Sequence, residues 1–252
     1  PLNPLIMGIK KIVDIISASD KAYPESIFGD NHKLCTCVNS AGYLLLRKDY
    51  GSYEKFDGIF IDGIWMCIFL RIFWNKKIKR RSFDMTSIAR DLFERLNDKD
   101  NHETVYFIGS RQDQVKASVG QFVKNYPDMK VIGFRNGYFR DDEDRTESIR
   151  EIVRLNPAYT IIGLGKPTQD YYGIDLFKAG YKGTVFTCGG FLHQSCENII
   201  YYPEWIDKYN LRSIYRFVRE GTWSRLWPDL FHFPFVFVHD RVRALFGTKS
   251  GR

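Results

Sequence analysis

The chain has 252 residues, which is enough for one large domain or for a domain with an appendage. A hydrophobic share of 44% supports a packed core, and a formal net charge of +7 favours an anionic partner such as a nucleotide, a nucleic acid or an acidic membrane surface. The five cysteines are odd in number and include no Cys-x-x-Cys pair, which argues against a disulfide framework and a zinc site. We therefore expect free thiols in a reducing cytoplasm.

No segment of the chain is predicted to cross a membrane. Charged residues interrupt the first 21 positions, so a secretory signal is not expected. The apolar run from Trp65 to Trp74 is interrupted by Arg71 and falls well short of the ~20 residues that a membrane-spanning helix needs. This run is predicted to be a buried or interfacial helix.

Strand and helix patterns alternate between about residues 33 and 188. Strands are expected at 34–38, 59–61, 105–108, 130–134, 159–162 and 184–187. Helices are expected at 112–125, 145–154 and 171–180. This alternation predicts an α/β fold, with a Rossmann-like parallel sheet and helices on both faces.

Ligands of such sheets bind beyond the carboxyl ends of the strands, and four expected strand ends carry Asp62, Gly109, Gly137 and Gly163. The last of them opens the segment 163–170, Gly-Leu-Gly-Lys-Pro-Thr-Gln-Asp. Glycines there would let backbone N–H groups approach a diphosphate, and Gln169 could bond a sugar hydroxyl. The segment indicates a nucleotide-sugar site, although an ordinary strand–helix turn would read the same way.

Two charged residues have matching catalytic interpretations. Asp62, held at the end of an apolar strand, could accept the proton of an attacking hydroxyl, or it could simply cap a helix that begins near Gly63. Arg80, in the basic segment 76–81, could stabilise a leaving diphosphate, or it could belong to a solvated loop.

Three further features are assigned structural roles. The acidic runs Asp98-x-Asp100 and 141–144 contain the Asp-x-Asp pattern of metal-dependent transferases, but neither directly follows a strand. We expect solvated loop or helix-start carboxylates there, and no metal or cofactor. His193, after the last expected strand, could touch the ligand, but we expect it to be a structural histidine.

The chain changes character after about residue 201, where aromatic and basic residues are dense. Arg212, Arg216 and Arg219 form a stripe beside an apolar helical stripe. The tail could bind nucleic acid, lie on an anionic bilayer, or pack against the core. Its Trp-Pro and Phe-Pro dipeptides favour a short, broken helical element over a nucleic-acid platform.

A set of motifs in order resembles the WecG/TagA/CpsF family of bacterial glycosyltransferases over about residues 33–230. The matching segments are 36–39, 60–63, 80–84, 105–109, 136–139, 163–170, 203–205 and 215–216. The resemblance implies inverting, metal-independent transfer of a sugar, often N-acetylmannosamine, from a UDP donor to a polyprenyl-diphosphate-linked acceptor. The setting would be synthesis of a bacterial surface polysaccharide, such as an exopolysaccharide or O-antigen.

The resemblance also implies roles for residues. Asp62 would be the base, Arg80 a phosphate contact and Gln169 a substrate contact. The remaining substrate-binding residues would be Thr36, Asn39, Gly63, Gly109, Gly137, Tyr138, Gly163, Gly165 and Pro167.

Residues 1–200 would form the catalytic domain and 201–252 a membrane-associating appendage, with Arg212, Arg216 and Arg219 on the bilayer or the acceptor phosphate. We expect a cytoplasmic protein, peripheral on the inner face of the membrane, whose partners are the UDP-sugar, the lipid-linked acceptor and the anionic membrane surface, and no nucleic acid. Whether the chain forms a homo-oligomer is left open by the sequence.

The chain departs from the family at two positions, a small change at Asp170 and a missing carboxylate after Phe191, and the second leaves the donor sugar open. Asp170 stands where the family has Glu, and Leu192 follows Phe191 where the family often has Asp. The alternative function is a catalytically inactive nucleotide-sugar-binding or scaffold protein of a polysaccharide assembly complex.

Overall fold

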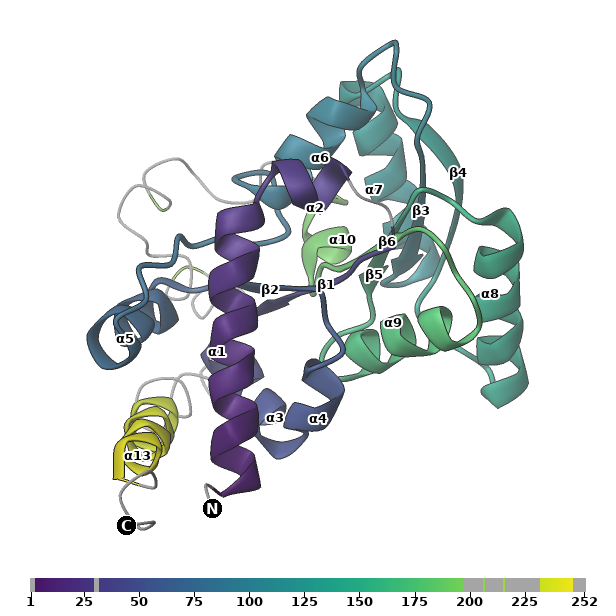
Figure 1. Ribbon diagram of the computed structural model, residues 1–252. Helices are drawn as coiled ribbons and strands as arrows, with labels where there is room; N and C mark the ends of the chain where they lie inside the picture. Colours follow the sequence, from purple (N-terminus) through teal and green to yellow (C-terminus); the bar gives the residue numbers. More distant parts are fainter. Residues whose placement is uncertain (1–2, 30–31, 197–205, 207–214, 216–231, 247–252) are drawn as a thin grey trace.

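The computed structural model describes residues 3–29, 32–196, 206, 215 and 232–246. Within them, six parallel strands form one sheet in the order β2-β1-β6-β5-β3-β4, and helices cover both of its faces (Figure 1). The strands are β1 (Leu34–Val38), β2 (Gly58–Ile61), β3 (Thr104–Gly109), β4 (Lys130–Arg135), β5 (Tyr159–Gly163) and β6 (Thr184–Thr187). The predicted α/β fold with a Rossmann-like sheet is confirmed.

The helices are α1 (Pro4–Ala22), α2 (Glu25–Gly29), α3 (Ser40–Lys48), α4 (Tyr50–Tyr53), α5 (Ile64–Trp74), α6 (Ile88–Leu96), α7 (Gln112–Asn125), α8 (Asp142–Leu155), α9 (Thr168–Lys178), α10 (Phe191–Gln194) and α13 (Phe233–Phe246). None of these described helices is both long and apolar enough to span a bilayer.

Alternation along the strands divides the core between the two faces of the sheet. In β1, Leu34 and Val38 pack with the α1, α3, α5, α8, α9 and α13 side, whereas Cys35 packs with the α2, α6, α7 and α10 side. Because strands buried on both faces are largely apolar, the five strands other than β4 read in the sequence as short apolar runs. The edge strand β4 is partly exposed, and it was predicted as well.

The longest helix, α1, was not predicted. Asn3 caps it by accepting the Leu5 N–H at its Oδ1, Pro4 occupies the first turn, and buried side chains such as Ile9 and Ile16 face the sheet. Figure 1 shows α1 crossing the sheet domain and reaching α13 at its N-terminal end. Its capping pair and its helical spacing of isoleucines were readable signals.

The C-terminal helix α13 packs onto the sheet domain. It contacts α1, α3 and α5, and its Phe233 and Phe237 are completely buried. Packing against the core, one of the three alternatives for the tail, therefore holds for this inner side of α13. The stripe of Arg212, Arg216 and Arg219 lies outside the described residues.

Candidate active site

The segment that carries Arg80 returns to the end of β2, where Asp62 lies. The Asp62 N–H donates to the Val38 carbonyl at 2.9 Å, which fixes this residue against β1. The Arg81 N–H donates to the Ile61 carbonyl at 2.8 Å, so residues 80–84 run beside the carboxyl end of the edge strand. Two segments separated by the whole of α5 thus meet at one point.

The structure brings the side chains of Asp62 and Arg80 together. Arg80 Nη2 lies 3.9 Å from Asp62 Oδ1, 3.6 Å from Asp84 Oδ2 and 2.9 Å from Ser82 Oγ. Ser82 and Asp84 orient the guanidinium, and its contact with Asp62 is the longest of the three. Both partners are partly buried, which strengthens their electrostatic interaction relative to a surface pair.

The structural alternatives, a helix cap for Asp62 and a solvated loop for Arg80, do not match this geometry. The N-cap of α5 is Gly63, without a side-chain capping bond, so Asp62 does not cap that helix. The Arg80 side chain is only 19% exposed, which a solvated loop would not produce.

The pKa values of two nearby thiols, those of Cys67 and Cys37, are affected by the charges around them. Burial raises the pKa of Cys67 to about 11; the Arg80 guanidinium opposes this rise and the Asp62 carboxylate adds to it. Burial also raises the pKa of Cys37 well above its usual value, with Asp62 adding to the rise and the Lys166 ammonium opposing it. Asp62 and Lys166 therefore both lie within electrostatic range of Cys37, at the end of β1.

A buried polar cluster lies next to this pair, centred on Asp170. Lys166 Nζ contacts both carboxylate oxygens of Asp170, at 3.0 and 2.7 Å, and the hydroxyl of Thr36 at 2.9 Å. Asp170 also accepts hydrogen bonds from Thr36 and from Tyr53, at 2.8 and 2.7 Å. Thr36 pairs in turn with Thr187 on β6. Lys166 thereby reaches from the β5–α9 turn across β6 to β1.

The structure gives Gln169 and Asn39 positioning contacts. Gln169 is 2% exposed, and its Oε1 accepts the Gly189 N–H at 3.1 Å, which supports the turn after β6. Asn39 caps α3 through a hydrogen bond from the Gly42 N–H to its Oδ1. The predicted contact of Gln169 with a substrate stays a prediction.

The predicted glycines line three neighbouring turns. A Cβ at Gly109 would lie 2.4 Å from the Gly163 carbonyl oxygen, and one at Gly137 would lie 3.0 Å from the Gly109 Cα. Gly109 also has a φ of +151°, which few other residues adopt. The turns after β3, β4 and β5 thus touch backbone to backbone. Gly163 ends β5, Gly165 lies in the following turn, and Pro167 is the N-cap of α9.

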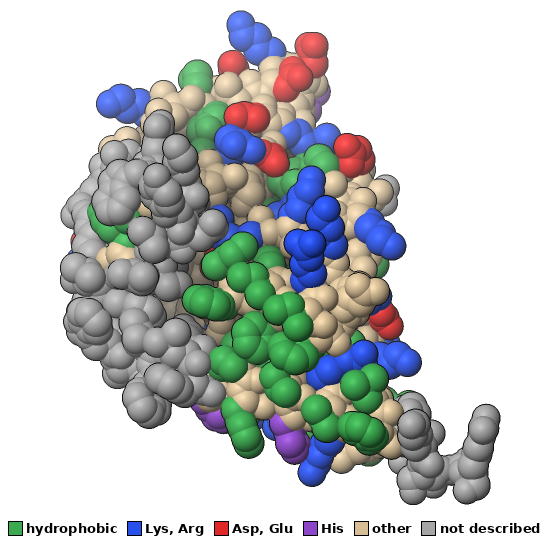
Figure 2. Space-filling view, turned by 90° about the vertical axis from the view of Figure 1, so that its left-hand side faces the viewer, with side chains coloured by type: hydrophobic (Ala, Val, Ile, Leu, Met, Phe, Trp, Pro, Cys, Tyr) green, Lys and Arg blue, Asp and Glu red, His purple; other side chains and the backbone are tan. Residues whose placement is uncertain are grey.

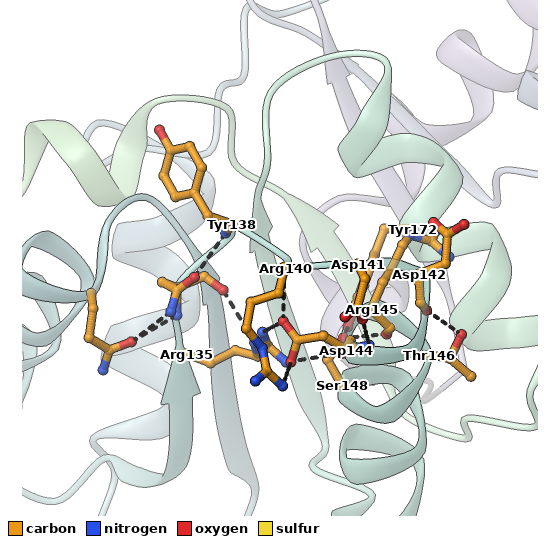
Figure 3. Close-up of polar contacts among 12 residues, drawn as sticks. Arg135, Tyr138, Arg140, Asp141, Asp142, Asp144, Arg145, Thr146, Ser148 and Tyr172 are labelled. Carbon is orange, nitrogen blue, oxygen red and sulfur yellow. Dashed lines mark hydrogen bonds and ion pairs between the residues drawn. The ribbon is translucent and has the colours of Figure 1, made fainter.

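Tyr138 stands at the rim formed by these turns. It is 70% exposed, and Asn136 Oδ1 accepts its N–H at 2.9 Å. Figure 3 shows its ring pointing away from the ion pair between Arg135 and Asp144. The phenol is thus available at the surface of the β4–α8 turn.

The acidic run 141–144 starts a helix, as expected. Asp141 caps α8 by accepting the Asp144 N–H at 2.7 Å, and Asp144 binds Arg135 and Arg140 (Figure 3). Among the described residues, no group of three His, Cys, Asp or Glu side chains is arranged to hold a metal ion. The ring of His193 pairs with the Gln114 side chain at 2.8 Å, and all five cysteines are free.

Sequence reasoning missed several residues of this region: Tyr53, Ser82, Lys166 and Thr187. Lys166 and Asp170 form an i, i+4 pair on either side of Pro167, a signal that could have been read. The contacts of Tyr53, Ser82 and Thr187 depend on tertiary packing, and no local sequence pattern indicates them.

Chemically, the arrangement places a carboxylate beside a guanidinium at the carboxyl edge of a parallel sheet. A carboxylate can accept a proton, and a guanidinium can bind a phosphate through two N–H groups. From β3 the chain continues to β4 on one side of the sheet, whereas from β5 it continues to β6 on the other side. The direction of the connections therefore reverses between the neighbouring strands β3 and β5, which end at Gly109 and Gly163. Such a switch point is where open α/β sheets bind nucleotides.

Comparison with known proteins agrees with this chemistry. The sequence pattern of the glycosyl transferase WecG/TagA/CpsF family matches residues 11–246. A UDP-Gal:alpha-D-GlcNAc-diphosphoundecaprenol beta-1,4-galactosyltransferase of Shigella boydii is 30% identical over 216 residues, covering 85% of this chain and 89% of the relative. An N-acetylglucosaminyldiphosphoundecaprenol N-acetyl-beta-D-mannosaminyltransferase of Bacillus subtilis (strain 168) is 26% identical over 168 residues, covering 66% of this chain and 62% of the relative. The chain belongs to the glycosyl transferase WecG/TagA/CpsF family and is a glycosyltransferase.

Proposed function

We propose that the chain transfers a hexose from a UDP donor to a GlcNAc-diphosphoundecaprenol acceptor at the cytoplasmic face of the membrane, in the synthesis of a surface polysaccharide. Both relatives carry diphosphoundecaprenol-linked acceptors in their names, and one names UDP-Gal as its donor. The observation that carries the proposal is the pairing of Asp62 with Arg80 at the carboxyl end of β2.

The sheet offers a path for the donor. The nucleotide would lie at the switch point between β3 and β5, close to Tyr138, whose exposed ring could stack on a base. Strands lie about 4.8 Å apart, so the end of β2 is roughly 14 Å from the end of β5, three strands along the sheet. A nucleotide sugar, with base, ribose, two phosphates and hexose in series, can bridge that span.

In the proposed reaction the acceptor hydroxyl attacks the anomeric carbon of the donor. The bond from that carbon to the phosphate oxygen breaks, and UDP leaves with the bonding electron pair. Asp62 takes the proton of the hydroxyl, and Arg80 stabilises the negative charge on the diphosphate. Both relatives make β-linked products, which an α-linked nucleotide sugar such as UDP-galactose gives by inversion.

The proposed residue roles separate contact from support. Asp62 and Arg80 act on the reacting groups, while Gln169, Asn39 and Thr36 hold the turns on which the substrate rests. The carboxyl-edge glycines at 63, 109, 137, 163 and 165 allow the backbone to approach the donor. The test is transfer of radiolabelled sugar from UDP-galactose and from UDP-N-acetylmannosamine to GlcNAc-diphosphoundecaprenol in detergent. Labelled lipid product with one donor supports the proposal, and donor binding without any product would instead favour an inactive binding protein.

A further inference from the structure

The C-terminal part of α1 contacts both segments that carry the proposed catalytic pair. Ser19 is 1% exposed, and its Oγ accepts the N–H of Ile59 on β2 at 3.0 Å. The next residue, Asp20, reaches the segment 79–81, which supplies the guanidinium. Asp62 directly follows β2, so two consecutive residues of one helix contact the strand that leads to the carboxylate and the segment that carries the guanidinium.

Asp20 holds the chain on both sides of Arg80. Its Oδ1 accepts the backbone N–H of Lys79 at 3.3 Å, and the same oxygen pairs with the guanidinium of Arg81. The Arg81 N–H in turn donates to the carbonyl of Ile61 at the end of β2. Arg80 therefore lies between two anchored neighbours, one bonded to α1 and the other bonded to both α1 and β2.

The ion pair between Asp20 and Arg81 is largely enclosed by protein. The two side chains are only 15% and 12% exposed. The Arg81 guanidinium also lies over the ring of Tyr23, 4.4 Å from its centroid, and that ring meets Phe60 of β2 edge-on. An ion pair shielded from water interacts more strongly than a surface pair, and the loss of one partner leaves the other charge buried without compensation. Asp20 therefore fixes Arg81 in one position.

The place of Asp20 is unfavourable for its own helix but favourable for the segment that it contacts. A carboxylate in the last turn of a helix is repelled by the negative end of the helix dipole, and Asp20 lies in the last turn of α1. Five of the six residues of the segment 76–81 are basic. Figure 2, which faces the side where α5 lies in Figure 1, shows Lys and Arg side chains gathered on that side. The carboxylate thus offsets repulsion within a basic segment next to the site.

We propose that Asp20 is a positioning residue for sugar transfer, which holds Arg80 where the leaving diphosphate of the donor lies. This inference deepens the proposed function and rests on it, because Arg80 has a diphosphate to stabilise only if the chain uses a nucleotide sugar. The charge on that diphosphate grows as its bond to the anomeric carbon breaks, so the guanidinium must be in place in the transition state. A displacement of about 1 Å can lower the rate by ~100-fold. Asp20 itself touches none of the reacting groups and acts through Arg80.

The experiment compares Asp20→Ala with Asp14→Ala in the full chain. Both carboxylates lie on α1 and contact the same basic segment, but Asp14 pairs with Lys76 at 3.2 Å and its side chain is 60% exposed. The kcat for transfer to GlcNAc-diphosphoundecaprenol should fall roughly 10- to 100-fold in Asp20→Ala and stay at the wild-type value in Asp14→Ala. The KM for the donor should change by a smaller factor than kcat, because the interaction with Arg80 is strongest in the transition state.

A double-variant cycle separates positioning from a general loss of structure. Arg80→Ala removes the guanidinium, so Asp20→Ala/Arg80→Ala should have the same kcat as Arg80→Ala alone. A fold that is loosened as a whole would instead lower kcat by the same factor in both backgrounds. Asp20→Asn keeps the size of the side chain and one acceptor oxygen but not the charge, and its kcat should lie between those of the wild type and Asp20→Ala.

Amide hydrogen exchange gives a measurement that needs no turnover. Exchange over residues 79–81 should be faster in Asp20→Ala than in the wild type, because the segment loses its bonds to α1. Exchange over the same residues should be unchanged in Asp14→Ala.

The outcomes separate the positioning role from the proposed function. A wild-type kcat in both Asp20 variants overturns the positioning role, and so does an equal loss of kcat in the presence and in the absence of Arg80. Unchanged exchange over residues 79–81 in Asp20→Ala overturns it even in a chain that transfers no sugar. A wild-type chain without transfer activity, in which Asp20→Ala nevertheless speeds this exchange, overturns the proposed function and leaves the contact of α1 with the Arg80 segment standing.

Discussion

At the scale of single residues, Asp170 is the most demanding feature of the site. Its carboxylate is 1% exposed, and it is compensated by Lys166 and by the hydroxyls of Thr36 and Tyr53. A buried charge is tolerated only when it is paired and fully hydrogen-bonded. The cluster therefore ties the β5–α9 turn to β1 in one arrangement.

Removing the cation should be costly because it leaves the charge of Asp170 buried without its ionic partner. We expect Lys166→Met to lower the free energy of unfolding by roughly 3–5 kcal/mol, measured by urea denaturation. Lys166→Met/Asp170→Asn should be less destabilised than that single variant.

The matched control for this prediction is Lys178→Met, at the end of the helix that carries Asp170. Lys178 pairs with Asp175, but its side chain is 66% exposed, so the change should stay within about 0.5 kcal/mol. If Lys166→Met were no more destabilising than Lys178→Met, the cluster would not be the constraint described.

At the scale of elements, α13 is attached to the sheet domain by both apolar and ionic contacts. Phe233 and Phe237 fill the space beside α1 and α5. Asp240 Oδ2 accepts hydrogen bonds from Tyr43 at 2.9 Å and from Arg47 Nε at 2.7 Å, both on α3. The same α3 begins at the Asn39 cap, so the attachment of α13 and the geometry of the site share one helix.

We expect Asp240→Ala to loosen α13, because it leaves Arg47 and the Tyr43 hydroxyl without their partner. The loss should be about 3–5 kcal/mol of stability, with faster amide hydrogen exchange over residues 233–246. Arg243→Ala, at an exposed position of the same helix, is the control and should leave exchange unchanged. Unchanged exchange in Asp240→Ala would show that the aromatic contacts alone hold the helix.

Helices and strands could be predicted from the sequence where their own residues show a clear pattern, and not where they depend on contacts with distant residues. Strands such as β5 and β6 are buried on both faces and appear in the sequence as short apolar runs, and α7 has a regular buried stripe. The bounds of these elements were therefore predicted closely. α8 begins at Asp142 instead of Arg145, because Asp141 caps it. The short helices α3 and α4 were missed, since their few apolar residues face partners that are distant in sequence.

The site residues also divide into those that the sequence predicted and those whose contacts it did not indicate. The motif residues Asp62 and Arg80 were predicted from pattern and resemblance, and the fold brings them together. The substrate contact of Gln169 stays a prediction, and the structure adds a hydrogen bond from the Gly189 N–H to its side chain. That hydrogen bond depends on the direction of one side chain within a turn, which sequence spacing does not specify.

At the scale of the whole molecule, the functions that we propose are spread along the sheet. The nucleotide would lie at the β3–β5 switch point, and the catalytic pair is at the edge strand β2 (Figure 1).

The raised pKa of the buried Cys67 thiol makes the stability of the whole fold depend on pH. In the folded chain the pKa of Cys67 is raised from 9.0 to about 11, because burial disfavours the thiolate. The folded state therefore holds this proton more tightly, and the resulting stability is present below pH 9 and is lost as the pH rises through 11. At about 1.4 kcal/mol per pKa unit, the loss approaches ~3 kcal/mol.

Thermal unfolding between pH 8 and 11 measures this dependence. The melting temperature should fall more steeply above pH 9 in the wild type than in Cys67→Ala, although the variant starts from a lower value because of the lost packing. Parallel slopes would show that the Cys67 thiol does not contribute.

The central claim is that the Asp62 carboxylate accepts the proton of the acceptor while Arg80 holds the diphosphate. The most direct test is the kcat of Asp62→Asn for sugar transfer to the lipid-linked acceptor, with the affinity for the UDP donor measured on the same sample. We predict a loss of kcat of about 10²–10⁴-fold with donor affinity close to that of the wild type. A kcat within a few-fold of the wild type would contradict the account.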